Sequence, residues 1–123
     1  MTGNKYQKLA SRTNDGLASE RLTFKMVEAF VDVGGVLNAC LGLAGEVGEL
    51  NDIIKKWVFH EKELDAIHLQ KELGDVMWYV AMMCQSMGWN LDDILQMNID
   101  KLIARYPDGF DVVKANNRQA GDV

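Results

Sequence analysis

Two pairs of acidic residues in this sequence have the spacing that metal chemistry needs. Glu46 and Glu49 are three residues apart in one apolar helical pattern, and Glu72 and Asp75 are three apart in a second. Residues at i and i+3 lie on one face of a helix, about one turn apart. A carboxylate on an apolar face is costly unless a positive group meets it. The two pairs therefore predict inward acids that need a cation.

The stretch between the two pairs, residues 50–71, is long enough to complete one helix, turn and return. An antiparallel pair of helices would then gather all four carboxylates. Four like charges in one pocket repel strongly at low effective dielectric, so either some are protonated or a hard cation lies among them. Oxygen-only ligands suit Mg²⁺ or Mn²⁺ rather than zinc, which prefers His or Cys. We therefore interpret Glu46, Glu49, Glu72 and Asp75 as ligands of Mg²⁺, for which Mn²⁺ can substitute.

Other interpretations of acidic residues on helices are open at this point. Most Glu-x-x-Glu pairs are solvated surface, and Asp52 and Glu63, which fall off the apolar stripe, are assigned to that class. A redox bundle with two metals would use Glu-x-x-His pairs, but neither His60 nor His68 stands three residues after a glutamate. Both histidines are expected to be structural or exposed. The alternative to an enzyme is a non-catalytic helical module that binds metal or a partner.

Basic residues near the acids are candidate phosphate contacts. Lys101 and Arg105 share one helix face at i and i+4, and Asn98 lies three residues before Lys101. Lysine supplies a point charge and arginine a bidentate contact, so together they can clamp a phosphate chain. Lys55 and Lys56 extend the first acidic helix beyond its glutamates. Runs of this kind are also common on solvated surface, and only a metal cluster nearby favours the clamp.

The elements that must position these side chains are expected to be helices. A single proline and long 3.6-residue apolar periods indicate an all-α chain. Helices are expected over 4–13, within 14–35, and over 36–59, 66–87 and 91–106, with the DVGG stretch at 32–35 as an interruption. Asp65 and Asn90 are expected N-caps, and Gly88 is expected to end its helix in the left-handed region.

Three further features carry structural expectations. Gly42, Gly45 and Gly48 each weaken a helix, so they predict a close approach of another helix or a ligand. Cys40 and Cys84 lie in apolar patterns and are expected to be buried, reduced thiols. The polar tail 111–123 is expected to be mobile. Its Lys114 and Arg118 repeat the i, i+4 spacing of the candidate clamp but are expected to take no part in binding.

Composition limits the classes of function. A chain of 123 residues with 48% hydrophobic and 25% charged residues is ordinary for one globular domain, which we expect to span 1–123. A net charge of −5 leaves no basic surplus for binding nucleic acid. No apolar run approaches the length of a membrane span, and the polar N-terminal stretch lacks a signal core. We therefore expect no nucleic-acid partner and no membrane partner. We expect a cytoplasmic location.

Three motifs resemble those of a known family. The stretches GLAGEVGEL, ELGDVMWYV and KLIARYP, joined to the four-acid pattern, are similar to the MazG-like nucleotide pyrophosphohydrolases of the all-α NTP pyrophosphatase superfamily. The resemblance is strongest over 37–110. It implies an all-α helical bundle whose active site is completed by oligomerisation, in a homodimer or a homotetramer.

The resemblance also implies an activity. The family hydrolyses a nucleoside triphosphate between the α and β phosphates, with Mg²⁺, to a monophosphate and pyrophosphate. Carried over by position, the four acids would hold metal, and phosphate or sugar contacts would come from Asn98, Lys101, Arg105 and Tyr106. In-line attack by water on the α-phosphorus needs a base. Glu49 is the candidate, with Glu46 as an equal alternative. Neither the base of the nucleotide nor its sugar is specified.

Overall fold

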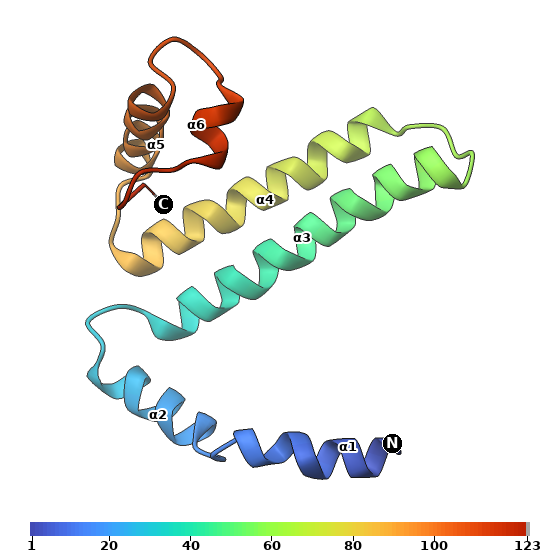
Figure 1. The fold of residues 1–123 in the computed structure, drawn as a ribbon, viewed down its shortest axis with the longest axis vertical. Helices are drawn as coiled ribbons and strands as arrows, with labels where there is room; N and C mark the ends of the chain where they lie inside the picture. Colours follow the sequence, from blue (N-terminus) through green and yellow to red (C-terminus); the bar gives the residue numbers. More distant parts are fainter. Residues whose placement is uncertain (123) are drawn as a thin grey trace.

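The computed structural model describes residues 1–122, and within them the chain contains α-helices and one short 3₁₀-helix but no strand. The elements in chain order are α1 (Gly3–Ala10), the 3₁₀-helix (Ser11–Thr13), α2 (Ala18–Glu28), α3 (Val33–Phe59), α4 (Ala66–Met87), α5 (Leu91–Arg105) and α6 (Val112–Asn116). The predicted all-α class is confirmed. Figure 1 shows α3 and α4 as a long antiparallel pair, with α1 and α2 extending from one end of it.

The ends of α4 form as the local sequence predicts. The Asp65 side chain accepts a hydrogen bond of 2.9 Å from the backbone N–H of His68, which satisfies a free donor in the first turn. At the other end Gly88 has φ 70°, and the N–H of Trp89 donates to the Cys84 carbonyl at 2.8 Å. This is the arrangement in which a left-handed glycine closes a helix. Both cap predictions on α4 are confirmed.

Close contacts at two glycines fix the register of α3 against α4. A Cβ at Gly35 would overlap the Ser86 hydroxyl, and a Cβ at Gly42 would overlap the ring of Tyr79. The same number of residues separates the two contact positions on each helix, so both contacts belong to one antiparallel register. Continuing that register along α3 brings Glu46 beside Asp75. Glycine packing therefore aligns the two acidic segments.

The start of α3 differs from the prediction. The DVGG stretch does not interrupt a helix; it is the beginning of α3, which starts at Val33 rather than at Val36. Asp32 caps this end by accepting a hydrogen bond of 3.0 Å from the Gly35 N–H. The N–H of Asp32 also donates to the Ser86 carbonyl at 3.1 Å. Glycine is present here because Ser86 lies where a side chain would be, and not because the helix breaks.

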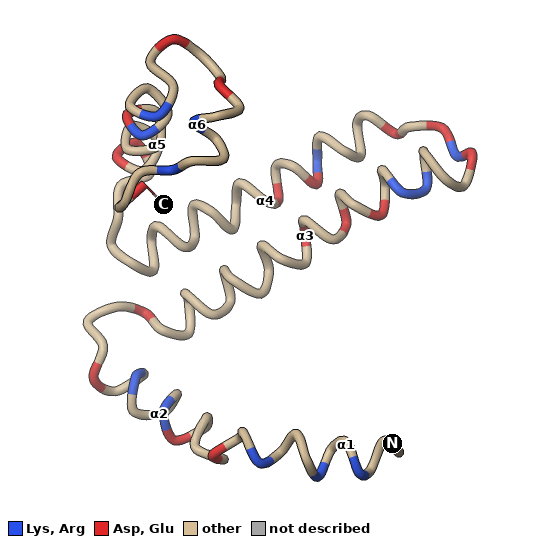
Figure 2. Tube along the Cα trace, in the orientation of Figure 1, with Lys and Arg blue, Asp and Glu red and all other residues tan. Residues whose placement is uncertain are grey.

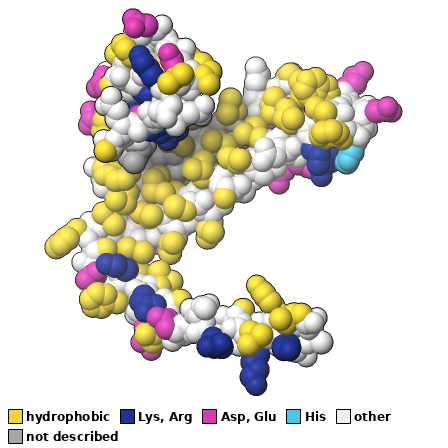
Figure 3. Space-filling model, viewed as in Figure 1, with side chains coloured by type: hydrophobic (Ala, Val, Ile, Leu, Met, Phe, Trp, Pro, Cys, Tyr) yellow, Lys and Arg dark blue, Asp and Glu magenta, His cyan; other side chains and the backbone are white. Residues whose placement is uncertain are grey.

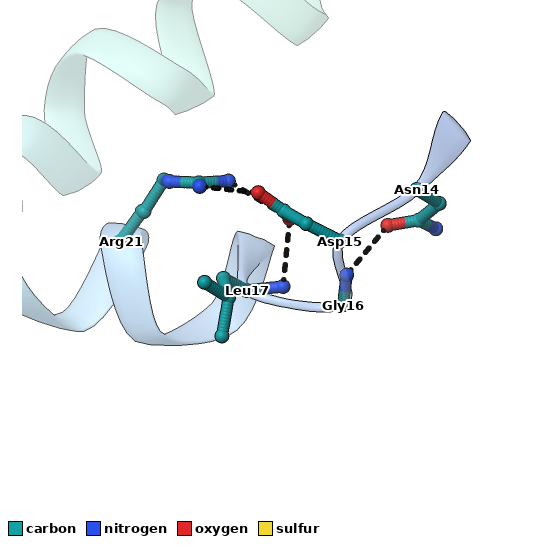
Figure 4. A network of polar contacts seen from close by, with 5 residues as sticks. All are labelled: Asn14, Asp15, Gly16, Leu17 and Arg21. Atoms are coloured by element: carbon teal, nitrogen blue, oxygen red, sulfur yellow. Dashed lines mark hydrogen bonds and ion pairs between the residues drawn. The ribbon is translucent and has the colours of Figure 1, made fainter. Parts of the chain in front are cut away.

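The connection from the 3₁₀-helix to α2 is a turn held by side chains (Figure 4). The N–H of Gly16 donates to the Asn14 side chain at 2.9 Å, and the N–H of Leu17 donates to the Asp15 carboxylate at 3.0 Å. Arg21, one turn into α2, donates to the same carboxylate at 3.0 Å. The helix predicted within 14–35 is confirmed as α2, which follows this turn.

The segment after α5 is partly ordered. Asn90 caps α5, accepting from the N–H of Asp92 at 3.0 Å, and α5 ends at Arg105. The stretch beyond it was predicted to be mobile, but it forms α6 and then folds back, so that Asp122 binds Arg105. Mobility of this stretch stays a prediction, whereas the ion pair joins residues far apart in sequence and was not predicted by the local pattern. Val123, the last residue of that predicted stretch, lies outside the described residues.

The chain exposes far more surface than a folded monomer of its mass. Its accessible area is 10190 Å², whereas about 6,600 Å² is expected for 13.8 kDa. Within residues 1–122 only Ala39 and Cys84 are buried hydrophobic residues. Cys40 is exposed, so its predicted burial is wrong, while that of Cys84 is confirmed. Cys40 immediately follows Ala39 in the helix and therefore faces a different direction from that buried residue.

Large apolar side chains account for much of this surface. Trp57 on α3 is 47% exposed and Trp78 on α4 is 52% exposed. Figure 3 shows hydrophobic side chains spread along the α3–α4 pair on the face in view. None of the described helices is long and apolar enough to cross a membrane.

Candidate metal centre

Three of the four predicted acids meet between α3 and α4. Glu46 comes from α3, and Glu72 and Asp75 come from successive turns of α4. One carboxylate oxygen from each lies within 4.8 Å of the others. Figure 2 shows acidic positions facing one another halfway along this helix pair. The arrangement offers three hard oxygen ligands on one side of a cation, which is a donor set that suits Mg²⁺ or Mn²⁺.

The electrostatics of the cluster favour a cation. Partial burial raises the pKa of Glu46 above its ordinary value, and a hydrogen bond with Glu72 raises it further. The negative charges of Asp75, Glu72 and Glu49 act in the same direction. The Glu72 side chain is only 15% exposed. These carboxylates therefore repel one another in a partly desolvated place, and a bound divalent cation would offset that repulsion.

A histidine borders the cluster. His68 Nε2 lies 2.8 Å from Glu72 Oε1, one turn earlier on α4, and the His68 side chain is about half exposed. His68 thus holds one oxygen of Glu72 and restricts its rotation. His60 is the exposed C-cap of α3. Both positions agree with the expectation that the histidines are structural or exposed, and the group of ligand atoms among the described residues contains neither of them.

Glu49 lies outside the group of three. It is exposed, one turn beyond Glu46 on α3, and its charge still contributes to the raised pKa of Glu46. Among the described residues, the group of close ligand atoms consists of Glu46, Glu72 and Asp75 and does not include Glu49. Glu49 is therefore near the cluster electrostatically but is not held in it.

Lys55 and Lys56 are engaged by an acid on their own helix. Asp52 Oδ1 lies 3.6 Å from Lys55 Nζ, and Asp52 Oδ2 lies 2.5 Å from Lys56 Nζ. The hydrogen bond with Asp52 raises the pKa of Lys56, and the charge of Glu49 adds to that effect. Asp52, interpreted from the sequence as plain surface, thus neutralises two candidate phosphate contacts at the far end of α3.

The predicted clamp on α5 is already partnered. The Arg105 side chain is 10% exposed, and its Nε donates to Asp122 Oδ2 at 2.6 Å while Nη2 binds the other carboxylate oxygen. Its guanidinium carbon lies 5.9 Å from the centre of the Tyr106 ring. Arg105 lowers the pKa of Asp122, and the charges of Arg118 and Lys101 lower it further. Asn98 and Lys101 lie exposed on α5.

A cavity of about 430 Å³ lies between α5 and the segment that follows it. Its basic lining residues are Lys101, Arg105, Lys114 and Arg118. From the sequence, Lys114 and Arg118 were predicted to take no part in phosphate binding, although they have the same i, i+4 spacing as Lys101 and Arg105. That spacing was the available signal, and it was discounted because the sequence tied no metal cluster to Lys114 and Arg118.

The acidic cluster and the basic cavity are separate within one chain. The helical stretch from Asp75 to Met87 is about 18 Å long at 1.5 Å per residue, and α5 begins only after it. No extensive packing joins α5 to α3 or α4. Figure 2 shows the basic positions of α5 and α6 away from the acids on the α3–α4 pair. A site that uses both groups would need a second copy or a movement of α5.

Comparison with known proteins gives a family for the chain. A model of the MazG nucleotide pyrophosphohydrolase domain matches residues 36–110, which include all four acids and the basic residues of α5. The Gene 37 protein of Mycobacterium phage L5 is 34% identical over 91 residues, which cover 70% of this chain and 79% of that protein. No solved structure matches the chain.

Proposed function

Because the chain belongs to the MazG nucleotide pyrophosphohydrolase domain family, we propose that it hydrolyses a nucleoside or deoxynucleoside triphosphate between the α and β phosphates. The products are the monophosphate and pyrophosphate, and the reaction depends on Mg²⁺. The observation that carries this proposal is the meeting of Glu46, Glu72 and Asp75 inside the matched region. Without a cation the three carboxylates repel one another, so the cluster favours binding of a polyphosphate that brings its own divalent cation.

Each acid has a distinct part in the proposal. Glu46, Glu72 and Asp75 hold the cation, and His68 fixes the orientation of Glu72 through its 2.8 Å contact. Bound Mg²⁺ supplies charge neutralisation on the phosphates and lowers the pKa of water. Glu49 is not held in the group of three, so its carboxylate is available to accept a proton. We therefore assign Glu49 as the general base, with Glu46 as the alternative.

The basic residues of α5 are proposed to bind the phosphate chain. Lys101 and Arg105 supply positive charge where it builds up on the pyrophosphate leaving group. Asn98 on α5 and Tyr106, the C-cap of that helix, flank them in the sequence and are proposed to add phosphate or sugar contacts. Lys55 and Lys56, which share Asp52, lie beyond Glu49 on α3 and are proposed to act at the outer edge of the site.

A second copy of the chain is proposed to complete the site. The exposed area of 10190 Å² exceeds the monomer expectation of about 6,600 Å² by roughly half. Half-exposed tryptophans on both α3 and α4 are the kind of surface that obligate dimers bury. The separation of acids from basic cavity within one chain supports an assembly in which the two come from different copies. A homodimer or a homotetramer satisfies this requirement.

The test is a product assay. Purified protein is incubated with each nucleoside and deoxynucleoside triphosphate plus Mg²⁺, and pyrophosphate and orthophosphate are measured separately. We expect pyrophosphate in equal amount to monophosphate, no orthophosphate, and no turnover in excess chelator. Metal binding without pyrophosphate release from any substrate would contradict the proposal and leave a non-catalytic metal-binding module.

A further inference from the structure

The cavity beside α5 is lined by basic side chains, as an anion-binding site would be. One carboxylate of the chain, that of Asp122, already binds Arg105 there. We propose that this cavity binds a phosphate-type anion, and that Asp122 is a built-in competitor which the anion must displace from Arg105. The identity of the anion as the phosphate chain of the substrate rests on the proposed function. The existence of the site rests on the geometry of α5 and the segment after it.

The charge balance of the cavity is the first argument. Four basic residues line it (Lys101, Arg105, Lys114 and Arg118), and Asp122 is the acidic residue among the lining residues. The chain as a whole carries a net charge of −5. A strongly positive cavity in an acidic protein concentrates anions locally, because close walls of one charge focus the field. The excess positive charge is more than one carboxylate neutralises.

The geometry of Arg105 is the second argument. The Arg105 side chain is only 10% exposed, and its guanidinium presents two N–H groups to the two oxygens of Asp122. A carboxylate and a phosphate fit this planar fork in the same way, with two parallel hydrogen bonds. Asp122 therefore stands where two phosphate oxygens would bind.

The position of Asp122 makes the contact reversible. The residue follows α6 in a short stretch of turns, and its side chain remains 19% exposed. Arg118 and Lys101 act on it through charge, so the same side chains would act on an anion that replaced it. Displacement costs one ion pair and gains contacts with a more highly charged ligand. Only molecules in which Asp122 has left Arg105 can bind the anion. The apparent affinity for the anion is therefore the intrinsic affinity multiplied by the fraction of such molecules.

Calorimetric titration with inorganic pyrophosphate, in excess chelator, tests the proposal without turnover. Chelator leaves the acidic cluster negative, so pyrophosphate is repelled there. We expect Asp122→Asn to bind pyrophosphate about tenfold more tightly than the unaltered chain, because the competing state is removed. Arg118→Ala is expected to bind about tenfold more weakly through loss of a charge-assisted contact. Circular dichroism checks that each variant keeps its helix content.

Matched controls are available at the other end of the chain. Asp15 binds Arg21 in a similar aspartate–arginine pair between the 3₁₀-helix and α2, so Asp15→Asn removes the same charge at a distant place. Arg12→Ala is the control for the loss of a cation. Neither control is expected to change pyrophosphate affinity.

Two outcomes overturn the proposal. If Asp122→Asn binds pyrophosphate no more tightly than the unaltered chain, Asp122 is not a competitor. If the control variants change affinity as much as the cavity variants do, net charge and not this cavity governs binding. Failure of the proposed function shows differently, since it removes pyrophosphate release in Mg²⁺ but leaves the titration in chelator unchanged.

Discussion

Gly42 on α3 lies directly against the ring of Tyr79 on α4, so a Cβ at this position would overlap ring atoms Cε1 and Cζ. The two helices can approach this closely only because Gly42 has no side chain. Glu46 follows one turn later on α3, and Asp75 precedes Tyr79 by one turn on α4. The glycine–tyrosine contact therefore controls how closely the two acidic segments come together.

We expect Gly42→Ala to destabilise the chain by roughly 1–3 kcal/mol, because the methyl group forces the Tyr79 ring or the helix to move. Gly45→Ala is the comparison on the same helix, since nothing in the described residues lies within 4 Å of its Cβ position. Alanine there should favour the helix by roughly 1 kcal/mol. Chemical denaturation of both variants measures the difference. Equal destabilisation by both would show that a further surface, such as a second copy, covers Gly45.

Features with a local cause were predictable from the sequence. Asp65 and Gly88 mark the ends of α4 because a cap and a left-handed residue act within one helical turn. The spacing of Glu46, Glu72 and Asp75 was sufficient to predict that they meet, because antiparallel helices joined by a short connection have few available registers. Sequence therefore indicated the helices and the centre of the acidic cluster.

Features with a distant cause were not predictable in the same way. Gly35 was interpreted as a helix breaker because the approach of Ser86 cannot be seen in the local sequence. Cys40 was assigned to the core, although among the described helices α4 alone packs extensively on α3 and α2 contacts it only slightly. The pairing of Arg105 with Asp122 joins α5 to a stretch of low apolar content. Each of these outcomes depends on which distant parts of the chain pack against the residue, or on the lack of such packing, and the local pattern shows neither.

Neutralising the acids on α4 should remove the activity without disrupting the fold. We expect Glu72→Gln and Asp75→Asn each to abolish pyrophosphate release while the helix content stays unchanged. In chelator both variants should melt at a higher temperature than the unaltered chain, because one of the clustered negative charges is removed. Glu63→Gln, in the exposed connection between α3 and α4, is the control. Unchanged turnover in the α4 variants would show that metal binds elsewhere.

The raised pKa of Glu46 predicts a pH dependence of stability in chelator. Below its unfolded pKa this side chain is protonated in both states and contributes nothing to the difference. As pH rises through the folded pKa, its ionisation in the cluster costs folding free energy. The melting temperature of the unaltered chain should therefore fall relative to Glu46→Gln as pH rises from the acid range towards neutrality. Saturating Mg²⁺ should abolish this relative fall, and a constant difference in chelator would contradict the prediction.

Lys101 provides the sharpest test of the phosphate clamp, because it lies on α5 one turn before Arg105 and lines the same cavity. We expect Lys101→Ala to lower kcat/KM by an amount equivalent to about 2–4 kcal/mol of transition-state stabilisation. The reason is that the substitution removes a positive charge that stabilises the negative pyrophosphate leaving group. Lys114 and Arg118 line this cavity too, so the matched control is Lys8→Ala on exposed α1. Steady-state kinetics with the best substrate of the product assay measures both. A silent Lys101→Ala would leave the acidic cluster and its cation to bind the phosphates alone, whereas an equal loss in Lys8→Ala would reduce the effect to overall charge.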